Sequence, residues 1–434
     1  MWNFDGVACA AALELGQPAY YFHANHLLYG FLGFLFWKGI AAPLGLSRAL
    51  PALQLFTSLL AAAGLVGLYK LLQSILNQKW IVLLLSSALA TTAAFWVWSV
   101  EAQVYALGFL ALAWASFLLL HHQSANKYIY VGILHGAAVL GHVMHALWVI
   151  PATYWIIGEC RHRRMSVSEP IRQYLLSAGL VTSLAYVAVL AFVIAPGRDA
   201  HHIAIWLKGS AGLTHDRLWQ WHFPGWSGPW IWLKSTGPAL WGCFWPYAKT
   251  TVTPWIWMAA VLSILLFTTL LIRACYGGFE RLFIFSCLWL GTYGLFFSTW
   301  EPTTLCYRVT DVLPLGILLA IGLRSWRIPI QWTLASLLLI STLTINLFTQ
   351  ILPMHRVELN KTYQETLSFS KITPANSLYV TSDSLTRLYI LYFTGREAWY
   401  TNSFEPHLLE AELFQQKQHR PVYLQTETSW RQIH

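Results

Sequence analysis

The segment FHANHLLYG at 22–30 carries the residues of this chain that are best suited to chemistry. It places two histidines, His23 and His26, and Asn25 beside an apolar run, and Asp5 lies shortly before it. Polar side chains at a membrane border cost free energy unless water, a partner or a substrate satisfies them. His23 and His26 are three residues apart, so on a helix they would share one face. The segment therefore predicts a polar site at the edge of a membrane region.

The composition indicates that lipid is the solvent of most of the chain. Of its 434 residues 56% are hydrophobic and 10% are charged, and the mean hydropathy is +0.50, whereas a typical soluble domain carries about 25% charged residues. The formal net charge of +9 fits basic residues on cytoplasmic loops and near anionic headgroups, so we expect no nucleic-acid partner. The six cysteines contain no C-x-x-C pair, and we expect no disulfide framework.

Long apolar runs predict an all-α polytopic bundle with about ten spans, since about 17–25 residues cross a bilayer. The segment 128–158 is too long for one span and predicts two short helices meeting at His142 and His145. The short run 310–324 suits a tilted span or one buried inside the bundle. The remaining runs are 52–74, 80–98, 104–121, 174–195, 252–273, 282–299 and 329–350.

The distribution of basic residues predicts the orientation of this bundle. Lysines and arginines gather in alternate short loops, which the positive-inside rule places in the cytoplasm. The opposite short loops, around 99–103, 142–145 and 300–309, contain a single lysine or arginine, which is Arg308. This places Glu101, Glu301, the loop 197–250 and the tail after 353 on the outer side. The loop residues that carry the signal are Lys70, Lys79, Lys127, Arg161, Arg163, Arg164, Arg172, Arg273, Arg281, Arg324 and Arg327.

The first part of the chain, residues 1–51, predicts an outer first loop and a juxtamembrane region rather than a span. Counting the apolar run 26–42 as a span would put Asp5 and His23 in the cytoplasm. Trp37 and Lys38 near the end of that run suit a helix lying at the interface instead. The N-terminus would then start outside without a preceding span. Two alternatives follow: the true start lies upstream of Met1, or the first span is absent.

The composition changes after Pro353. Residues 52–353 form the predicted membrane bundle, whereas 354–434 carry polar residues at ordinary soluble density. Strand-like runs at 377–382 and 421–425 and a helical run near 384–393 predict a small α/β appendage on the outer side.

The polar residues of the outer border converge in this topology. A carboxylate there can act as a general base, and a cation can hold a phosphate leaving group; each histidine can also be an ordinary interfacial residue. His142 and His145 are a turn apart, but without a third ligand nearby a hydrogen-bonded pair at the helix break is favoured over a metal site. The tryptophans of the outer loop predict an interfacial aromatic belt, with stacking on a sugar or lipid headgroup as the alternative. They are Trp219, Trp221, Trp226, Trp230, Trp232, Trp241 and Trp245.

Five motifs occur in an order that resembles the C-type (GT-C) glycosyltransferase superfamily, and within it the bacterial protein O-mannosyltransferase-like membrane proteins. Those enzymes carry an acidic residue in the first outer loop and an H-P-x-H-like motif on juxtamembrane helices. His23 and His26 match that motif, whereas Ala24 stands where proline is expected. The motifs are NFDGVACAAALELG, FHANHLLYGFLG, VEAQVYALGFLAL, HGAAVLGHVMH and STWEPTTLCYR.

The resemblance implies a polyprenyl-phosphate-linked sugar as the donor and an extracytoplasmic acceptor. It implies that Asp5 is the base that deprotonates the acceptor. Glu101 and Glu301 match further acidic positions and complete the expected catalytic set. We expect His23, His26, His142, His145 and Arg308 to bind substrate, with Arg308 on the donor phosphate because its planar fork can bind bidentately.

The sequence thus predicts a membrane glycosyltransferase of the hexosyltransferase kind in the bacterial inner membrane, with its active face outside and no required metal. A transporter or lipid flippase would also place ionisable residues in an internal cavity. Against it stand the absence of evident repeat symmetry and the clustering of polar residues at one border. A non-catalytic scaffold derived from the enzyme family is the third alternative.

Overall fold

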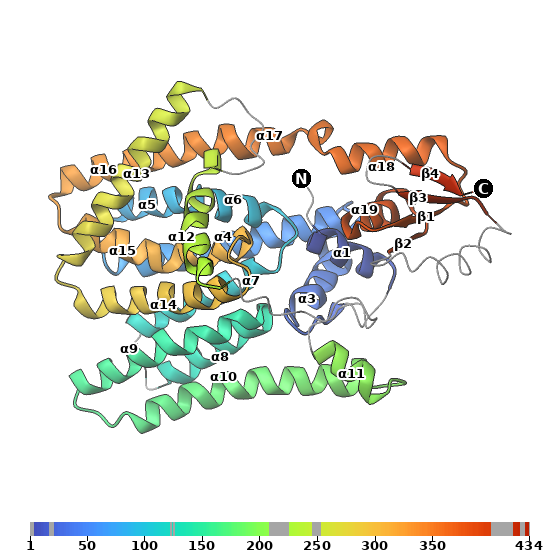
Figure 1. The fold of residues 1–434 in the computed structure, drawn as a ribbon. Helices are drawn as coiled ribbons and strands as arrows, with labels where there is room; N and C mark the ends of the chain where they lie inside the picture. Colours follow the sequence, from blue (N-terminus) through green and yellow to red (C-terminus); the bar gives the residue numbers. More distant parts are fainter. Residues whose placement is uncertain are drawn as a thin grey trace.

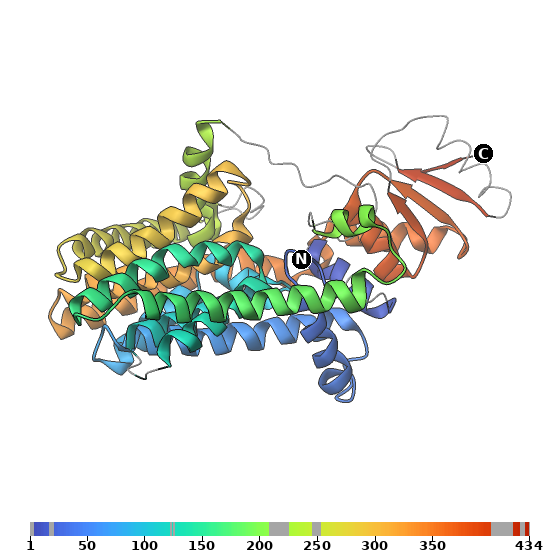
Figure 2. The ribbon, with the colours of Figure 1, turned by 90° about the horizontal axis from the view of Figure 1, so that it is seen from below.

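The computed structural model describes residues 4–16, 21–121, 124, 126–207, 225–244, 253–400, 420–425 and 430–433. Long helices lie side by side in a bundle, and a small sheet with its own helices lies at one end of it (Figures 1 and 2). The same end carries two short helices near the start of the chain, α1 (Phe4–Glu14) and α3 (Tyr29–Phe36). The predicted fold class, a helix bundle with a small α/β appendage, is therefore confirmed.

The bundle is built from helices rich in leucine, alanine and aromatic residues. Within the described residues, six helices are long and apolar enough to cross a membrane, or seven if the bent pair α5 (Lys79–Ala90) and α6 (Ala93–Val100) is one span. The shorter apolar helix α7 spans Tyr105–His121. The six are α4 (Ala49–Gln73), α10 with its π-helical end (Ser168–Ile194), α13 (Pro254–Cys275), α14 (Glu280–Thr299), η5 with α15 (Leu305–Arg324) and α16 with its extensions (Ile328–His355).

The run 80–98 is not the single straight helix that a span would suggest, because α5 and α6 meet at an angle of 75°. The bend lies at Thr91 and Thr92. The side-chain amide of Asn346 donates a hydrogen bond to the Thr91 carbonyl oxygen at 2.7 Å, and the Thr92 hydroxyl donates to the Leu89 carbonyl at 2.7 Å. The Asn346 amide thus supplies a donor to a backbone carbonyl at the break in the helix.

Two expectations about short membrane segments are confirmed. The run 128–158 forms α8 (Lys127–Gly141), a 3₁₀ turn η2 (Val143–Trp148) and α9 (Val149–His162), with the break at His142. His142 has extended backbone, and its Nδ1 accepts a hydrogen bond from the Met144 amide at 3.2 Å, as a helix-capping residue does. Helix α15 (Val312–Arg324) is buried along nearly its whole length, as expected for a span inside the bundle.

Close packing between α8 and α10 depends on a small residue. A Cβ atom at Gly132 would lie 2.0 Å from the Ser177 hydroxyl oxygen and 2.4 Å from the Tyr174 carbonyl oxygen of α10. The two helices can therefore approach only because position 132 has no side chain, which is a common solution where helices associate without a hydrophobic driving force.

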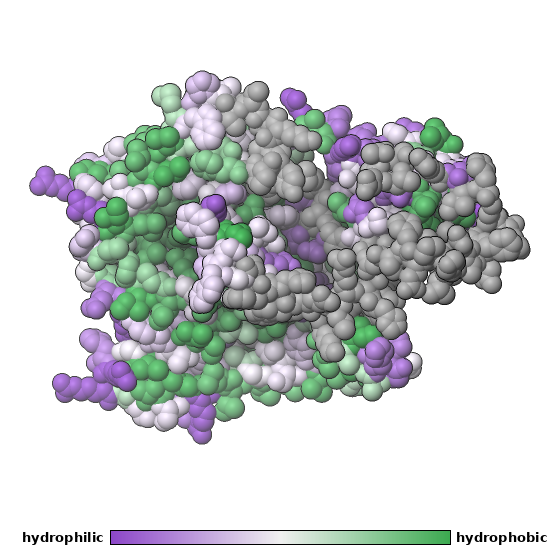
Figure 3. Space-filling model, in the orientation of Figure 1, coloured by the Kyte–Doolittle hydropathy of each residue, from purple (hydrophilic) through white to green (hydrophobic). Residues whose placement is uncertain are grey.

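The two ends of the bundle differ in character. The turns between α4 and α5, α9 and α10, α13 and α14, and α15 and α16 lie at the end opposite to the sheet (Figure 1). These turns carry or adjoin most of the basic residues that gave the orientation signal. In Figure 3 hydrophobic residues cover much of the side of the bundle, whereas hydrophilic residues gather at this end and on the appendage.

The appendage contains a four-stranded sheet in the order β2-β1-β3-β4. Strand β1 (Leu378–Thr381) is parallel to β2 (Ala398–Tyr400) and to β3 (Val422–Gln425), and β4 (Trp430–Ile433) is antiparallel to β3. All four residues of β1 are buried, as expected of a central strand. Helices α18 (Lys361–Ile372) and α19 (Ser384–Tyr389) accompany the sheet, and α19 continues into the π-helical turn η8 (Ile390–Thr394). Both predicted strands and the predicted helix are thus present.

Candidate functional site

Asp5 lies in the first turn of α1, where the helix dipole favours a carboxylate. Asp5 is accessible to solvent, but many protein groups lie around its carboxylate and reduce its hydration. The loss of hydration raises the pKa of Asp5 above its usual value, a hydrogen bond with the Gln103 amide opposes this, and the charge of Glu301 raises the pKa further. A carboxylate with a raised pKa holds a proton more tightly, which makes Asp5 a better general base than an isolated aspartate.

Glu301 belongs to the loop between α14 and the 3₁₀ helix η5 (Leu305–Asp311). Its Oε2 atom accepts hydrogen bonds from the Thr304 hydroxyl at 3.0 Å and from the Tyr307 hydroxyl at 3.2 Å. These two donors hold the carboxylate in place. The structure therefore brings Asp5 and Glu301 within electrostatic range of each other, from positions almost 300 residues apart in the chain.

The turn that carries His23 and His26 is attached to the break between α8 and α9. The amide of His26 donates to the His23 carbonyl at 3.1 Å, and the two rings stack with centroids 4.2 Å apart. The Asn25 carbonyl accepts a hydrogen bond from the Val143 amide at 2.8 Å. Both histidines are thereby held beside His142, whose ring centroid lies 6.4 Å from that of His26.

Burial, followed by the neighbouring His23 and His142, lowers the pKa of His26 well below its usual value. His26 is therefore a neutral imidazole at physiological pH. A neutral ring can accept or donate a hydrogen bond to a sugar hydroxyl but supplies no positive charge for a phosphate.

Two tyrosines join the histidines to the carboxylates. The Tyr105 ring stacks on His142 with centroids 5.3 Å apart, and the Tyr307 ring meets His142 edge-on at 6.2 Å. Tyr307 also donates its hydroxyl proton to Glu301. Electrostatic interactions of Asp5 reach both tyrosines and Cys306. The sequence interpretation did not name Gln103, Tyr105 or Tyr307, although all three fall inside motifs that it quoted.

His145 lies deeper than the other histidines. Its ring is fully buried against Gly108, where a Cβ atom would lie 2.0 Å from Nε2. Its Nδ1 is 3.1 Å from the Tyr293 hydroxyl, and its backbone carbonyl accepts a hydrogen bond from His135 Nε2 at 2.8 Å. His142 and His145 lie at the helix break with their ring centroids 6.4 Å apart, and the His145 amide donates to the His142 carbonyl at 3.0 Å.

Arg308 is buried and makes polar contacts with protein groups. Its Nε atom is 2.6 Å from Asp311 Oδ2, and its terminal nitrogens donate to the Trp232 carbonyl at 3.0 Å, Ser235 at 3.2 Å and Thr236 at 2.8 Å. Its guanidinium carbon lies 3.8 Å from the centroid of the Trp232 ring. These three partners belong to helix α12 (Ser227–Leu240), which runs crosswise to α14 in Figure 1. Arg308 therefore fastens α12 to the loop that carries Glu301.

Glu101 follows α6 and is 5% exposed. Burial raises the pKa of Glu101 to about 7, against a hydrogen bond with Gln54 that lowers it. Its electrostatic interactions reach Tyr29 and Tyr389, the latter in the appendage. Glu101 thus lies toward the appendage, and Tyr29 interacts electrostatically with both Glu101 and Asp5.

The outer tryptophans do not act as one group. Trp226 is 94% exposed and Trp230 is also exposed, as an interfacial belt requires, whereas Trp241 is buried and donates to the Ser263 hydroxyl at 2.7 Å. Trp219, Trp221 and Trp245 lie outside the described residues. In the part of the chain that the structure describes, no group of three or more His, Cys, Asp or Glu side chains is arranged to hold a metal ion.

No protein-family model and no curated protein matches the chain. Its fold is similar to two solved structures of ArnT from Cupriavidus metallidurans. The structure of ArnT bound to undecaprenyl phosphate matches with a TM-score of 0.60 and 10% sequence identity, over 98% of this chain and 88% of that one. The structure of ArnT in the apo state matches with a TM-score of 0.62 and 11% identity over the same shares. The chain therefore shares the fold of ArnT.

Proposed function

We propose that this chain is a membrane glycosyltransferase that moves a sugar from a polyprenyl-phosphate donor to an extracytoplasmic acceptor. The observation that carries the proposal is the contact of Tyr307 with both the Glu301 carboxylate and the His142 ring. Asp5 interacts electrostatically with Glu301 and Tyr307, and the stacked rings of His23 and His26 lie beside His142. It occurs in a chain with the fold of ArnT, whose structure holds undecaprenyl phosphate. We place the protein in the bacterial inner membrane with this site on the outer side, and we assign it a hexose donor as the O-mannosyltransferase-like motifs imply.

In this proposal Asp5 removes the proton from an acceptor hydroxyl or amine. The acceptor atom then forms a bond to C1 of the sugar, the bond from C1 to the phosphate oxygen breaks, and polyprenyl phosphate leaves with both electrons. The phosphate is already a good leaving group, so the enzyme mainly supplies a base, orientation and a site with little water. The neutral imidazoles and the tyrosine hydroxyls can orient sugar hydroxyls.

Glu301 supports the base. Its charge raises the proton affinity of Asp5, while Thr304 and Tyr307 keep the carboxylate fixed. We retain Glu101 as a third acidic group of the site, at its appendage side. We retain Arg308 as the candidate partner of the donor phosphate, although Asp311 offsets its charge and α12 takes three of its N–H donors.

The test is transfer by purified protein in lipid, using a polyprenyl-phosphate hexose with a labelled sugar. Asp5→Asn keeps the shape of the side chain but cannot accept the proton, so we expect turnover to fall by at least about 10²-fold. Asp199→Asn is the matched control, because Asp199 is an exposed aspartate just before α11 (Ala200–Leu207) that pairs with His202 of that helix.

Full activity in Asp5→Asn would remove the assignment of the base. Donor binding by the wild-type protein without any transfer would favour the scaffold alternative, and movement of the intact donor across the bilayer would favour a flippase.

A further inference from the structure

Glu14, the last residue of α1, forms hydrogen bonds with residues at the start of α4 and with the appendage. Both of its carboxylate oxygens accept a hydrogen bond from Arg48 Nε at 3.0 Å. Its Oε1 atom also accepts from the Ala49 amide at 2.7 Å and from the Tyr392 hydroxyl at 2.9 Å. Ala49 is the first residue of α4, so the carboxylate satisfies a free helix N–H group where the helix dipole favours negative charge.

Tyr392 supplies the contact from the appendage. It belongs to η8, 344 residues from Arg48, and its side chain is buried. Its hydroxyl accepts a hydrogen bond from the Leu50 amide at 3.0 Å while donating to Glu14, and its carbonyl accepts from Arg48 at 2.8 Å. The Arg48 guanidinium also lies over the Tyr392 ring at 4.3 Å from its centroid. We call Glu14, Arg48 and Tyr392 the clasp.

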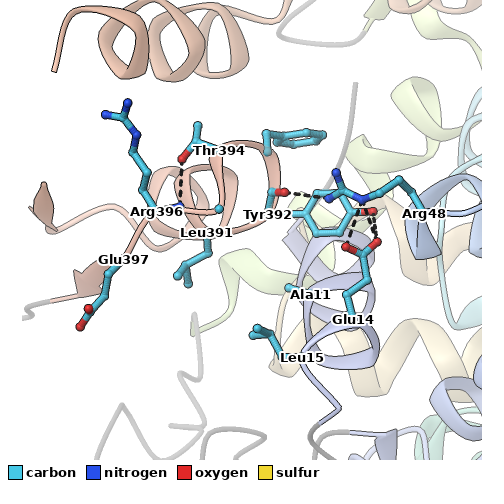
Figure 4. A pocket seen from close by; sticks show the side chains of 11 residues that line it. Ala11, Glu14, Leu15, Arg48, Leu391, Tyr392, Thr394, Arg396 and Glu397 are labelled. Atoms are coloured by element: carbon cyan, nitrogen blue, oxygen red, sulfur yellow. Dashed lines mark hydrogen bonds and ion pairs between the residues drawn. The ribbon is translucent and has the colours of Figure 1, made fainter. Parts of the chain in front are cut away.

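The clasp borders a cleft of about 750 Å³ between the end of α1 and the segment 391–397 of the appendage. Figure 4 shows the side chains of Glu14, Arg48 and Tyr392 pointing toward one another, whereas Arg396 and Glu397 point away from them. Arg48 is half-exposed in this cleft. Such a partly solvated ion pair adds little to overall stability, so its main consequence is the geometry that it imposes.

That geometry concerns the candidate base. Asp5 and Glu14 lie in the first and last turns of the same short helix, about 14 Å apart along its axis at 1.5 Å per residue. The buried face of α1, which includes Val7, Ala10 and Leu13, packs against the bundle. A contact that fixes the far end of so short a helix also fixes the direction in which Asp5 projects.

We propose that the clasp is a positioning device through which the appendage holds Asp5 at the reacting acceptor. The inference rests on the proposed function, because it takes Asp5 as the base. The appendage is then part of the catalytic unit and not a passive attachment. Glu14, Arg48 and Tyr392 act through α1 and do not touch the substrate. A shift of about 1 Å in a catalytic group can cost about 10²-fold in rate.

The experiment measures kcat and donor KM for Tyr392→Phe, Glu14→Gln and Arg48→Lys in the full chain. We expect kcat to fall by roughly 10- to 100-fold in Glu14→Gln and by a smaller factor in Tyr392→Phe, with donor KM within about twofold. Arg48→Lys keeps the charge but loses the contact to the Tyr392 carbonyl, so an intermediate loss is expected. Glu397→Gln is the matched control, since Glu397 lines the same cleft but pairs with Arg420 within the appendage.

Hydrogen exchange of the amides in 4–14 gives a second readout that does not depend on transfer. We expect faster exchange in Glu14→Gln and Tyr392→Phe than in Glu397→Gln. Wild-type kcat in both Glu14→Gln and Tyr392→Phe would overturn the proposal, even if their thermal stability were lower, because a merely structural contact changes stability alone. If the wild-type protein transfers no sugar, the proposed function fails by itself. Unchanged exchange in 4–14 of the clasp variants would then overturn the proposal that the clasp holds α1, and faster exchange would support it.

Discussion

The carboxyl group of Glu101 couples the stability of the protein to pH. Burial raises its pKa from 4.5 to about 7 in the folded chain. The folded state therefore binds this proton more tightly than the unfolded state does, and the contribution of Glu101 to stability is greatest below about pH 4.5. It decreases as the pH rises toward 7 and stays constant above that pH.

We expect Glu101→Gln to remove this decrease, because an amide does not ionise. The midpoint temperature of unfolding of the wild type, followed by tryptophan fluorescence in detergent, should be lower at pH 8 than at pH 5, and the difference should shrink in Glu101→Gln. Glu358→Gln serves as the control, since Glu358 is exposed. An equal pH dependence in wild type and Glu101→Gln would show that other groups cause it.

At the scale of elements, Arg308 joins α12 to η5. Arg308 contacts three residues of α12 and pairs with Asp311. Arg308→Ala leaves the buried Asp311 carboxylate without its partner, which typically costs about 3–5 kcal/mol. Arg308→Lys keeps a charge for Asp311 but cannot reproduce the planar fork. We therefore expect both variants to unfold at lower temperature, Ala more than Lys.

Donor binding separates the two roles of Arg308. If it contacts the donor phosphate as proposed, purified and folded Arg308→Lys should bind the donor more weakly, and Arg308→Ala should nearly lose binding. Unchanged donor affinity per folded molecule in Arg308→Ala would restrict Arg308 to holding α12.

Elements set by local pattern could be predicted from the sequence, whereas contacts between distant elements could not. The break at His142 followed from polar residues and Gly141 inside an apolar run, and the strands at 377–382 and 421–425 followed from their β-rich composition. The bend between α5 and α6 depends on Asn346, about 250 residues away, so no local signal marks it. For the same reason the sequence could name Asp5 and Glu301 but not their hydrogen-bond partners Gln103 and Tyr307.

At the scale of the whole molecule, the two ends of the bundle differ in charge and in content. The basic turns lie at one end, and α1, α3 and the sheet lie at the other (Figures 1 and 2). Positive charge favours the cytoplasmic side, so the candidate site, the cleft and the appendage should all face outward. The proposed chemistry requires this arrangement, because an extracytoplasmic acceptor can reach Asp5 only from that side.

Cysteine labelling in intact cells tests the orientation. The background is a variant without the six native cysteines, and single cysteines replace Ser227 at the start of α12, Lys361 at the start of α18 and Arg164 in the turn between α9 and α10. All three positions are exposed. With a reagent that does not cross the inner membrane, we expect labelling at 227 and 361 in intact cells and labelling at 164 only after lysis. The opposite pattern would invert the bundle and place Asp5 in the cytoplasm, where the proposed extracytoplasmic transfer could not occur. Labelling at 361 but not at 227 would show that the appendage and α12 do not both face outward. We expect both to face outward, because Arg308 ties α12 to the loop of Glu301 at the same end of the bundle.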